Sequence, residues 1–581
     1  MKEFRLLSFF VAITIIVATL NACASELTSS NSTEEKLAIL DMPTHKTFSG
    51  SYLAGRFAQR QQDWHAAEHY MGVVLEHDKD NKLLQQRAFL LSLGAENYAK
   101  ARVLADEIIA SGNTNEIVVI FAAASEISQG RYDTAIDYIK KLPDDGFGQY
   151  TKPLLTAWAL TGLDKKQEAI DVLSKNMEAG DASYYLHTAL IREMMGDMPA
   201  AAAAYKETMK AGLTLHSSVI TGHFFERYGQ PEISKMIYTG LGKLYPFNPF
   251  ISAISQLRAD GKNVPVDVAN VQEGAGLALL ELATLLYEKH AYDSSLIYAS
   301  IVEMLMPQSP SVNLLMGDIA ATRMKYAEAS ARYDLIPEKS PLYWLSRMRM
   351  SEIYETQGKR DDSIAMLNQM AENPLLRVNA LVALGDLYRQ EEDFKDAFEA
   401  YDKAIADIGE LSEEHWPLIY ARGMSLERLN NWEQAEKDLM QALNFQPDNP
   451  MILNFIGYNW VDKGVHLEKA LDYIKRAVDM RPDDGYILDS YGWAHYRLGH
   501  YKDAVEWMEK SAAIVPDDAT ILDHLGDAYW QAGRRDEARY KWLRAHDISH
   551  DAAFKVKVQG KIDNGLAQSP TPPVAQKEAK L

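Results

Sequence analysis

Cysteine is nearly absent from this sequence. The chain has 581 residues and one cysteine, Cys23. A single thiol cannot form an intramolecular disulfide, and it cannot supply the paired cysteines of a structural zinc site. Neither a disulfide framework nor a multi-cysteine metal centre is therefore expected.

The chain is also poor in positive charge. Its 60 Lys and Arg residues are outnumbered by 81 Asp and Glu residues, which gives a formal net charge of -21, and no sustained basic run occurs. Binding to nucleic acid requires clusters of basic side chains that contact phosphates. We therefore expect no nucleic-acid partner, and we expect proteins as the partners.

Long apolar runs are missing except at the start of the sequence. Lys2 and Arg5 precede an almost unbroken apolar run from residue 6 to residue 20. The run is short for a membrane span, and a basic start, an apolar centre and small residues are the order found in secretory signals. Residues 1–22 are therefore predicted to be a signal peptide, and the remainder is expected in an aqueous compartment.

Cys23 directly follows Leu20-Asn21-Ala22. This stretch resembles a bacterial lipobox, in which the cysteine becomes the lipid-bearing first residue of the mature protein. The resemblance implies that Cys23 is lipidated, and the absence of Asp from positions 24 and 25 implies the outer membrane of a Gram-negative cell, with the chain facing the periplasm. The alternative is an ordinary secretory signal with an incidental cysteine. Residues 23–46 are rich in Ser, Thr, Asn and Glu and are predicted to be a flexible tether.

What the sequence does contain is a repeat of 34 residues. Gly492 and Gly526 are separated by this interval, as are Ala504 and Ala538. Within one unit, Gly492 and Ala504 are expected to let two helices approach closely. Gly499 supplies the turn between them, and Pro516 ends the second helix because it lacks an amide proton. Each unit is therefore predicted to be a helical hairpin.

Gly492, Gly499, Ala504, Met508 and Pro516 match the pattern of the tetratricopeptide repeat (TPR), which the sequence resembles. The resemblance implies an all-α TPR superhelical solenoid of about fourteen hairpins in two sub-arrays. The predicted divisions are an N-terminal TPR-like array at 47–248, a linker at 249–275, a C-terminal TPR array at 276–552, and a capping helix with a disordered tail at 553–581.

The resemblance also implies a binding surface, because the first helices of stacked TPR units line a concave wall. Its inward positions predict a partner-binding set of Asn454, Tyr458, Asp489, Trp493, Tyr496, Arg497, Asp523, Asp527 and Trp530. Aromatic side chains beside carboxylates are typical of protein-recognition surfaces. Alternatively, the tryptophans pack between repeats and the acids only solvate the wall.

Residues 450–545 are similar to the C-terminal repeats of proteobacterial TPR lipoproteins, some of which are outer-membrane adaptors of a periplasmic carboxyl-terminal processing protease. The shared features are Ile456-Gly457-Tyr458, Leu488-Asp489-Ser490 and the stretch from His524 to Asp527. The resemblance implies a non-enzymatic adaptor with no cofactor. The alternative is a scaffold for assembly or export of pili, exopolysaccharide or outer-membrane proteins. The oligomeric state is left open.

One motif suggests a different class of protein. His65, Glu68 and His69 form HxxEH, the pattern of an inverted zinc-protease site, in which two histidines bind zinc and the glutamate activates water. Ala67 is expected to face the partner helix, which leaves both histidines on the solvated side, and no third ligand is evident. A zinc metallohydrolase is therefore the less favoured hypothesis, and no catalytic or metal-binding residues are assigned.

Overall fold

The computed structural model describes residues 47–112, 115–176, 181–259, 264 and 266–566. These ranges contain the α-helices α1 to α30 and no strand, so the predicted all-α fold is confirmed. No helix within them combines the length and the apolar character that crossing a membrane requires. Cys23, the predicted signal peptide and tether, and the chain after residue 566 lie outside the described residues.

The chain divides into two compact units, residues 1–84 and residues 85–581. The described part of the first unit contains the helix pair α1 (Phe48–Arg60) and α2 (Trp64–His77). Ala67 and Met71 are fully buried between these helices. A Cβ atom added at Gly55 would lie 3.3 Å from the Cβ atom of Tyr70, so the two helices are in close contact.

The helix α3 (Lys82–Gly94) crosses the boundary between the units, and all later helices belong to the second unit. Its N-terminal helices are α4 (Tyr98–Ala110), α5 (Glu116–Ser128), α6 (Tyr132–Ile139), α7 (Gly148–Gly162), α8 (Lys166–Asn176), α9 (Ala182–Met194), α10 (Met198–Ala211), α11 (Leu215–Arg227), α12 (Pro231–Leu244) and α13 (Pro249–Ala259). The central helices are α14 (Val271–Glu288), α15 (Tyr292–Leu305), α16 (Pro310–Thr322), α17 (Tyr326–Asp334), α18 (Tyr343–Thr356), α19 (Arg360–Ala371), α20 (Arg377–Gln390) and α21 (Phe394–Ile408). The C-terminal helices are α22 (Trp416–Arg428), α23 (Trp432–Phe445), α24 (Pro450–Lys463), α25 (Leu467–Met480), α26 (Gly485–Arg497), α27 (Tyr501–Ile514), α28 (Ala519–Gln531), α29 (Arg535–Ile548) and α30 (Ala552–Asn564).

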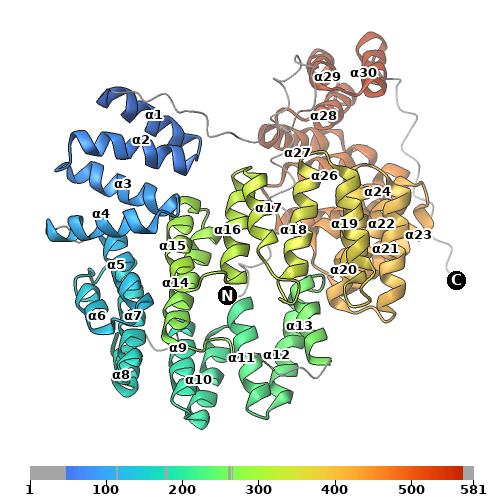
Figure 1. Ribbon diagram of the computed structural model, residues 1–581. Helices are drawn as coiled ribbons and strands as arrows, with labels where there is room; N and C mark the ends of the chain where they lie inside the picture. The colour runs from blue at the N-terminus through green and yellow to red at the C-terminus, as the bar shows by residue number, and fades with distance from the viewer. Residues whose placement is uncertain (1–46, 113–114, 177–180, 260–263, 265, 567–581) are drawn as a thin grey trace. The chain divides into compact units, whose positions relative to one another are not determined.

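Successive helices of the second unit pack as pairs, and neighbouring pairs stack on one another (Figure 1). The pairs are α5/α6, α7/α8, α9/α10, α11/α12, α14/α15, α16/α17, α18/α19, α20/α21, α22/α23, α24/α25, α26/α27 and α28/α29. The predicted hairpins are therefore present, and the helices form the stacked array typical of TPR proteins.

In the hairpins that contain Gly492 and Gly526, the residue seven places after this glycine forms the turn between the two helices. Gly499 follows Gly492 with φ +82°, and Gly533 follows Gly526 with φ +86°. Both turn glycines therefore have the left-handed backbone that favours glycine. A Cβ atom added at Gly492 would lie 2.6 Å from Met508 Cγ, which confirms the predicted close approach.

The predicted linker, residues 249–275, is partly helical. The helix α13 begins at Pro249, where the missing amide proton costs no helical hydrogen bond. Phe250 and Ile254 of this helix are buried, and α13 packs against α18. The helix α14 then begins at Val271, so only residues 260–270 lie between the two helices.

The helix α14 lies against α5, α7 and α9, the first helices of three N-terminal pairs (Figure 1). A Cβ atom added at Gly274 would come within 2.4 Å of the Trp158 ring, so this glycine is required for the close packing of α14 on α7. Gly274 therefore has a packing role. The wall formed by these first helices is covered by a segment of the same unit.

Candidate partner-binding surface

The predicted surface residues lie on three adjacent first helices, α24, α26 and α28, which contact one another in this order. Asn454 on α24, Asp489 on α26 and Asp523 on α28 occupy the same repeat position. Tyr458, Trp493 and Asp527 occupy the position one helical turn later. Side chains four residues apart share one face of a helix, so these residues form one wall.

Burial divides this wall into two parts. Asn454, Tyr458, Trp493, Tyr496 and Arg497 are partly exposed. A second group is almost fully buried, with exposed fractions of 3 to 9%: Asp489, Asp523, Asp527 and Trp530. The buried group contains every predicted residue of α28.

The helix α30 covers the α28 part of the wall. The Lys561 ammonium donates to both carboxylate oxygens of Asp523 and of Asp527, at distances between 2.7 and 2.8 Å. The Trp542 Nε1–H donates to Asp527 Oδ1 at 2.9 Å. Burial and the neighbouring Asp523 charge raise the pKa of Asp527, although Lys561 opposes this rise. The sequence analysis missed Lys561, which follows Asp527 by 34 residues and could have been found from that interval.

Trp530 is also held by residues of this chain. Its Nε1–H donates to the Leu566 carbonyl at 3.0 Å, and the Arg535 guanidinium lies 4.1 Å from the ring centroid. Gly565 lies against the same indole, because an added Cβ atom would come within 1.9 Å of it. Trp530 therefore packs within the C-terminal end of the array.

A stack of rings forms the boundary between the buried part and the partly exposed part. The Trp493 ring stacks on His524 with a centroid distance of 4.2 Å, and on Tyr496 at 4.7 Å. The His524 Nδ1–H donates to Asp489 Oδ2 at 2.8 Å. Burial lowers the pKa of His524, but the Asp489 charge and this hydrogen bond outweigh burial, so the pKa lies above its usual value. Asp489 therefore stabilises the charged form of the His524 ring.

Three polar atoms on the α24 and α26 part of the wall have no hydrogen-bond partner among the described residues. They are Asn454 Oδ1, Asp489 Oδ1 and Trp493 Nε1, and each is shielded from solvent. Unpaired buried polar groups are rare in folded proteins, so each of these atoms requires an explanation. Two acceptors and one donor on one wall are suited to hydrogen bonds with a peptide.

The wall continues onto α22, which the sequence analysis did not include. Tyr420 occupies the same repeat position as Asn454, and its ring packs edge-on against Phe455 at 5.7 Å. Burial, followed by the Asp462 and Asp489 charges, raises the pKa of the neighbouring Tyr458 to about 12. Tyr458 therefore stays a neutral phenol that can donate a hydrogen bond.

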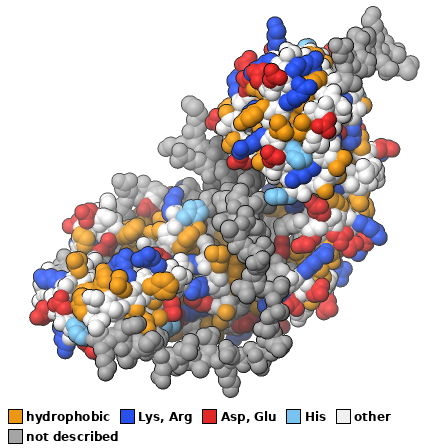
Figure 2. Space-filling view, turned by 90° about the horizontal axis from the view of Figure 1, so that it is seen from above, with side chains coloured by type: hydrophobic (Ala, Val, Ile, Leu, Met, Phe, Trp, Pro, Cys, Tyr) orange, Lys and Arg blue, Asp and Glu red, His pale blue; other side chains and the backbone are white. Residues whose placement is uncertain are grey.

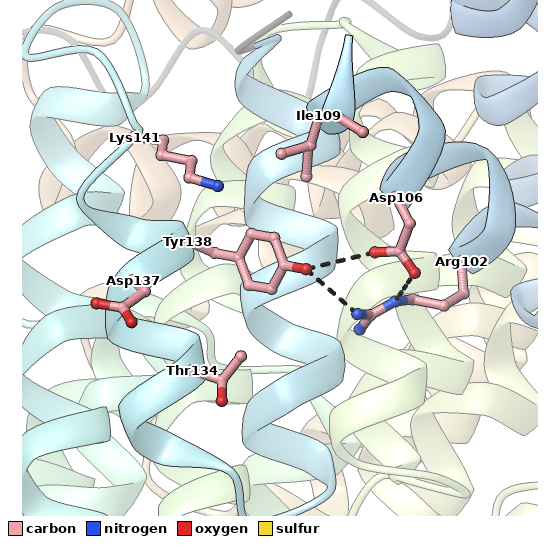
Figure 3. Close-up of a pocket in the computed structure, with 8 residues that line it drawn as sticks. Arg102, Asp106, Ile109, Thr134, Asp137, Tyr138 and Lys141 are labelled. Carbon is pink, nitrogen blue, oxygen red and sulfur yellow. Dashed lines mark hydrogen bonds and ion pairs between the residues drawn. The ribbon is translucent and has the colours of Figure 1, made fainter. Parts of the chain in front are cut away.

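A separate hollow of about 460 Å³ lies between the outer helices α4 and α6 (Figure 3). Its polar groups largely satisfy one another. The Arg102 guanidinium pairs with Asp106 and Glu126, and the Tyr138 hydroxyl lies between Arg102 and Asp106. This arrangement contains no nucleophile paired with a base, so it is a surface groove with its charges neutralised.

The N-terminal wall contains a second polar cluster, formed with α14. Glu281 accepts from the Ser183 hydroxyl at 2.5 Å, and its carboxylate lies 3.4 Å from His187 Nε2. The Trp158 Nε1–H donates to His187 Nδ1 at 3.0 Å. Because Ser183 donates directly to the carboxylate and His187 accepts from an indole, the cluster lacks the order of a catalytic triad. Its contacts join α14 to α7 and α9.

The HxxEH motif lies on α2 in the first unit. His65 and His69 are exposed and Ala67 is fully buried, as the sequence predicted. In the described residues, these side chains are not part of a group of three or more donors close enough to bind one metal ion.

On the face drawn in Figure 2, basic and acidic side chains are interspersed across the described surface.

Comparison with known proteins identifies the repeats. One family model described as tetratricopeptide repeat matches residues 349–410 and 466–519. A second model with the same description matches residues 417–449. The chain is 27% identical, over 187 residues, to a TPR repeat-containing protein of Pseudomonas aeruginosa. This match covers 32% of the chain and 30% of that relative, so the chain spans under a third of the relative's length.

Solved structures with low sequence identity are also similar. The Cut9–Hcn1 hetero-tetramer of the APC/C gives a TM-score of 0.37 at 14% identity, covering 90% of this chain and 96% of that chain. Yeast Tom70 gives 0.27 at 14% identity, covering 89% and 95%. The MamA protein gives 0.25 at 21% identity, covering 33% and 98%. The match to tetratricopeptide repeats thus covers part of the chain, within residues 349–519.

Proposed function

We propose that this protein is a non-enzymatic scaffold that binds protein partners through the wall formed by α22, α24 and α26. The main observation is that Asn454 Oδ1, Asp489 Oδ1 and Trp493 Nε1 lack hydrogen-bond partners among the described residues. An unpaired buried polar atom costs free energy that a partner's peptide groups recover on binding. Partly exposed aromatic rings beside these atoms supply apolar contact area.

The proposed surface excludes α28. Asp523, Asp527 and Trp530 are occupied by Lys561 and Leu566 of the same chain, so they support the end of the wall. Tyr458, Trp493 and Tyr496 remain partly exposed and are the proposed contact residues. Of the predicted set, the α24 and α26 members are therefore the ones proposed to meet a partner.

We further propose that the scaffold is attached to the outer membrane by lipid on Cys23 and faces the periplasm. The support is the lipobox-like stretch before Cys23 and the absence of Asp at the two following positions. A lipid anchor raises the local concentration of the wall near membrane-associated partners. Replacing Cys23 with Ser should abolish incorporation of labelled fatty acid and release the protein from the outer-membrane fraction. Retention of the label in the variant would contradict this proposal.

The proposed partner is a periplasmic carboxyl-terminal processing protease. The support is the resemblance of residues 450–545 to TPR adaptors of such proteases. A scaffold for pilus, exopolysaccharide or outer-membrane protein assembly is the second candidate, and the same resemblance to TPR lipoproteins motivates it. Measuring cleavage of a protease substrate with and without the purified chain distinguishes the two, because only an adaptor accelerates cleavage.

The binding surface is tested with a photoreactive amino acid placed at position 458 or at position 540 of the full chain in cells. Tyr458 lies on the proposed wall, whereas Tyr540 is a 65% exposed tyrosine on the second helix α29. A discrete crosslinked partner should form from position 458 only, and Asn454→Ala should reduce its yield. Equal crosslinking from both positions would contradict the surface assignment.

A further inference from the structure

The turn between α26 and α27 brings two histidines and one aspartate together outside the proposed wall. His495 lies near the end of α26, His500 is the residue before α27, and Asp503 lies in the first turn of α27. One nitrogen of each imidazole and one carboxylate oxygen lie within 4.8 Å of one another. Among the described residues, these three form the one group of His, Cys, Asp or Glu side chains whose donor atoms are close enough to bind the same metal ion.

The geometry of the turn causes this arrangement. Gly499 has φ +82°, and the His500 N–H donates to the His495 carbonyl at 2.8 Å. The chain therefore reverses within a few residues, and the centroids of the two imidazoles lie 5.7 Å apart. The His500 side chain makes no capping hydrogen bond to α27, so its ring nitrogens are not used by the helix.

His495 has a feature that packing alone does not explain. Its Nδ1 atom is shielded from solvent and has no hydrogen-bond partner among the described residues. The ring packs edge-on against Tyr491 at a centroid distance of 4.7 Å, which limits its orientations. A histidine that served only to fill space would normally pair this nitrogen with a protein group or with water.

A neutral imidazole has a lone pair available for a metal ion, and a carboxylate can supply a third donor. Asp503 makes no hydrogen bond or ion pair with other described residues and is exposed. A carboxylate in the first turn of a helix also interacts favourably with the helix dipole. This interaction does not explain the unpaired His495 Nδ1 atom.

We propose that His495, His500 and Asp503 bind one divalent transition-metal ion of the zinc class. Two imidazole nitrogens and one carboxylate oxygen are ligands that zinc commonly takes, with water at the remaining position. Ligands bonded to a tetrahedral ion lie about 3.3 Å apart, given metal–ligand bonds of about 2.0 Å. The exposed side chains of His500 and Asp503 can rotate to reach this spacing around the less mobile His495.

The ion would join the end of α26 to the start of α27. Trp493 and Tyr496 lie on either side of His495 on α26, so the bound ion would limit motion of the helix that carries these two proposed contact residues. The proposed role of the ion is structural, because all three ligands lie on the turn that joins two packed helices.

Titration of the full chain with Zn²⁺ alone, followed by Co²⁺ alone, tests the proposal by calorimetry and by the visible absorption of bound Co²⁺. The protein should carry a tag that lacks histidine. We expect one ion per chain with a Kd in the micromolar range, and at least tenfold weaker binding for His500→Ala and for Asp503→Asn. Both positions are exposed, so neither change should affect folding, which circular dichroism would check.

Two control variants identify which histidines bind the ion. His550→Ala removes an exposed histidine of the same unit and should leave the affinity unchanged. The double variant His65→Ala/His69→Ala removes the HxxEH pair and should also leave it unchanged. The proposal is overturned if no ion binds below about 1 mM, if His500→Ala binds as the parent does, or if only the double variant loses the ion.

Discussion

Lys561 and Asp527 lie 34 residues apart in the sequence, and the Lys561 ammonium lies 2.7 Å from Asp527 Oδ1. Gly560 follows Gly526 by the same interval. The helix α30 is therefore in the register of a first helix of one more repeat, although an added Cβ atom at Gly560 would meet only open space. Its contacts close the buried end of the wall, as terminal capping elements do in repeat proteins.

Replacing Lys561 with Met should destabilise the C-terminal end of the array. The variant leaves Asp523 and Asp527 buried without their cation, and breaking a buried ion pair by removing one partner costs about 3 kcal/mol or more. Hydrogen exchange of the α28 to α30 amides should detect the loss, because stability in repeat arrays is largely local. The exposed Lys557, on the same helix, provides a control, and Lys557→Met should leave exchange nearly unchanged.

The His524 and Asp489 pair should make stability depend on pH. Because the pKa of His524 lies above its ordinary value in the folded state, its contribution is fully present below about pH 6.5 and is lost as pH rises through the folded pKa. The raised pKa of Asp527 acts in the same direction, but its contribution begins to be lost at lower pH, above about pH 3.9. Asp523 and Lys561 face the same cluster. The thermal midpoint by circular dichroism should fall between pH 5.5 and pH 8.5.

The variant His524→Asn tests the contribution of His524. Asparagine places a donor near the position of Nδ1 but does not titrate, so the fall in thermal midpoint between pH 5.5 and pH 8.5 should become smaller. His550→Asn should show the parental pH dependence, because His550 is exposed and outside the cluster. An unchanged slope in His524→Asn would show that His524 does not carry this dependence.

The repeat interval predicted much of the C-terminal fold because its determinants are local. Gly492 needs its neighbour twelve residues later, Ala504, and the turn at Gly499 depends on a single backbone conformation. The position of α14 could not be predicted in this way. Its contacts include the hydrogen bond between Ser183 and Glu281, which lie 98 residues apart. A periodic sequence pattern does not show which distant helices a given helix will contact.

The same limit applies to the binding surface. The TPR resemblance placed Asp489 and Asp523 at equivalent positions, and the structure confirms that their helices are neighbours. The resemblance could not distinguish the exposed members of the wall from the covered ones. That distinction depends on Lys561, which lies after the last regular repeat. The assignment of Tyr458 and Trp493 to a partner remains a prediction.

Met324 occupies a turn where glycine should be more stable. It has φ +59° and is 74% exposed, and it lies at the repeat position that Gly499 and Gly533 occupy in later repeats. A side chain in the left-handed region costs about 1 kcal/mol, so Met324→Gly should stabilise α16 and α17 by up to about that amount. Hydrogen exchange of these helices measures the change.

A matched substitution shows that the turn conformation causes this effect. Met236 is 58% exposed within α12, where glycine is unfavourable because of its larger backbone entropy in the unfolded chain. Met236→Gly should destabilise α12 by about 1 kcal/mol. Destabilisation by both substitutions would show that the side chain of Met324 contributes more than its backbone strain removes.

Glu281 should make the packing of α14 sensitive to acid. Burial raises the pKa of Glu281, but the hydrogen bond and charge of His187 and the hydrogen bond from Ser183 outweigh burial, so the pKa lies below its usual value. A lowered carboxylate pKa contributes stability that is present above about pH 4.3 and is lost as pH falls through the folded pKa. Exchange of α14 amides should therefore become faster in acid, after correction for the intrinsic rate.

The variant Glu281→Gln keeps the size of this side chain and removes its charge. It should weaken the packing of α14 by about 1 to 3 kcal/mol at neutral pH, since His187 and Ser183 lose a charged acceptor. It should also remove the acid dependence of α14 exchange. The exposed Glu288, at the end of the same helix, provides the control, and Glu288→Gln should retain both the parental stability and its acid dependence. If both variants behave alike, Glu281 does not hold α14 on the N-terminal wall.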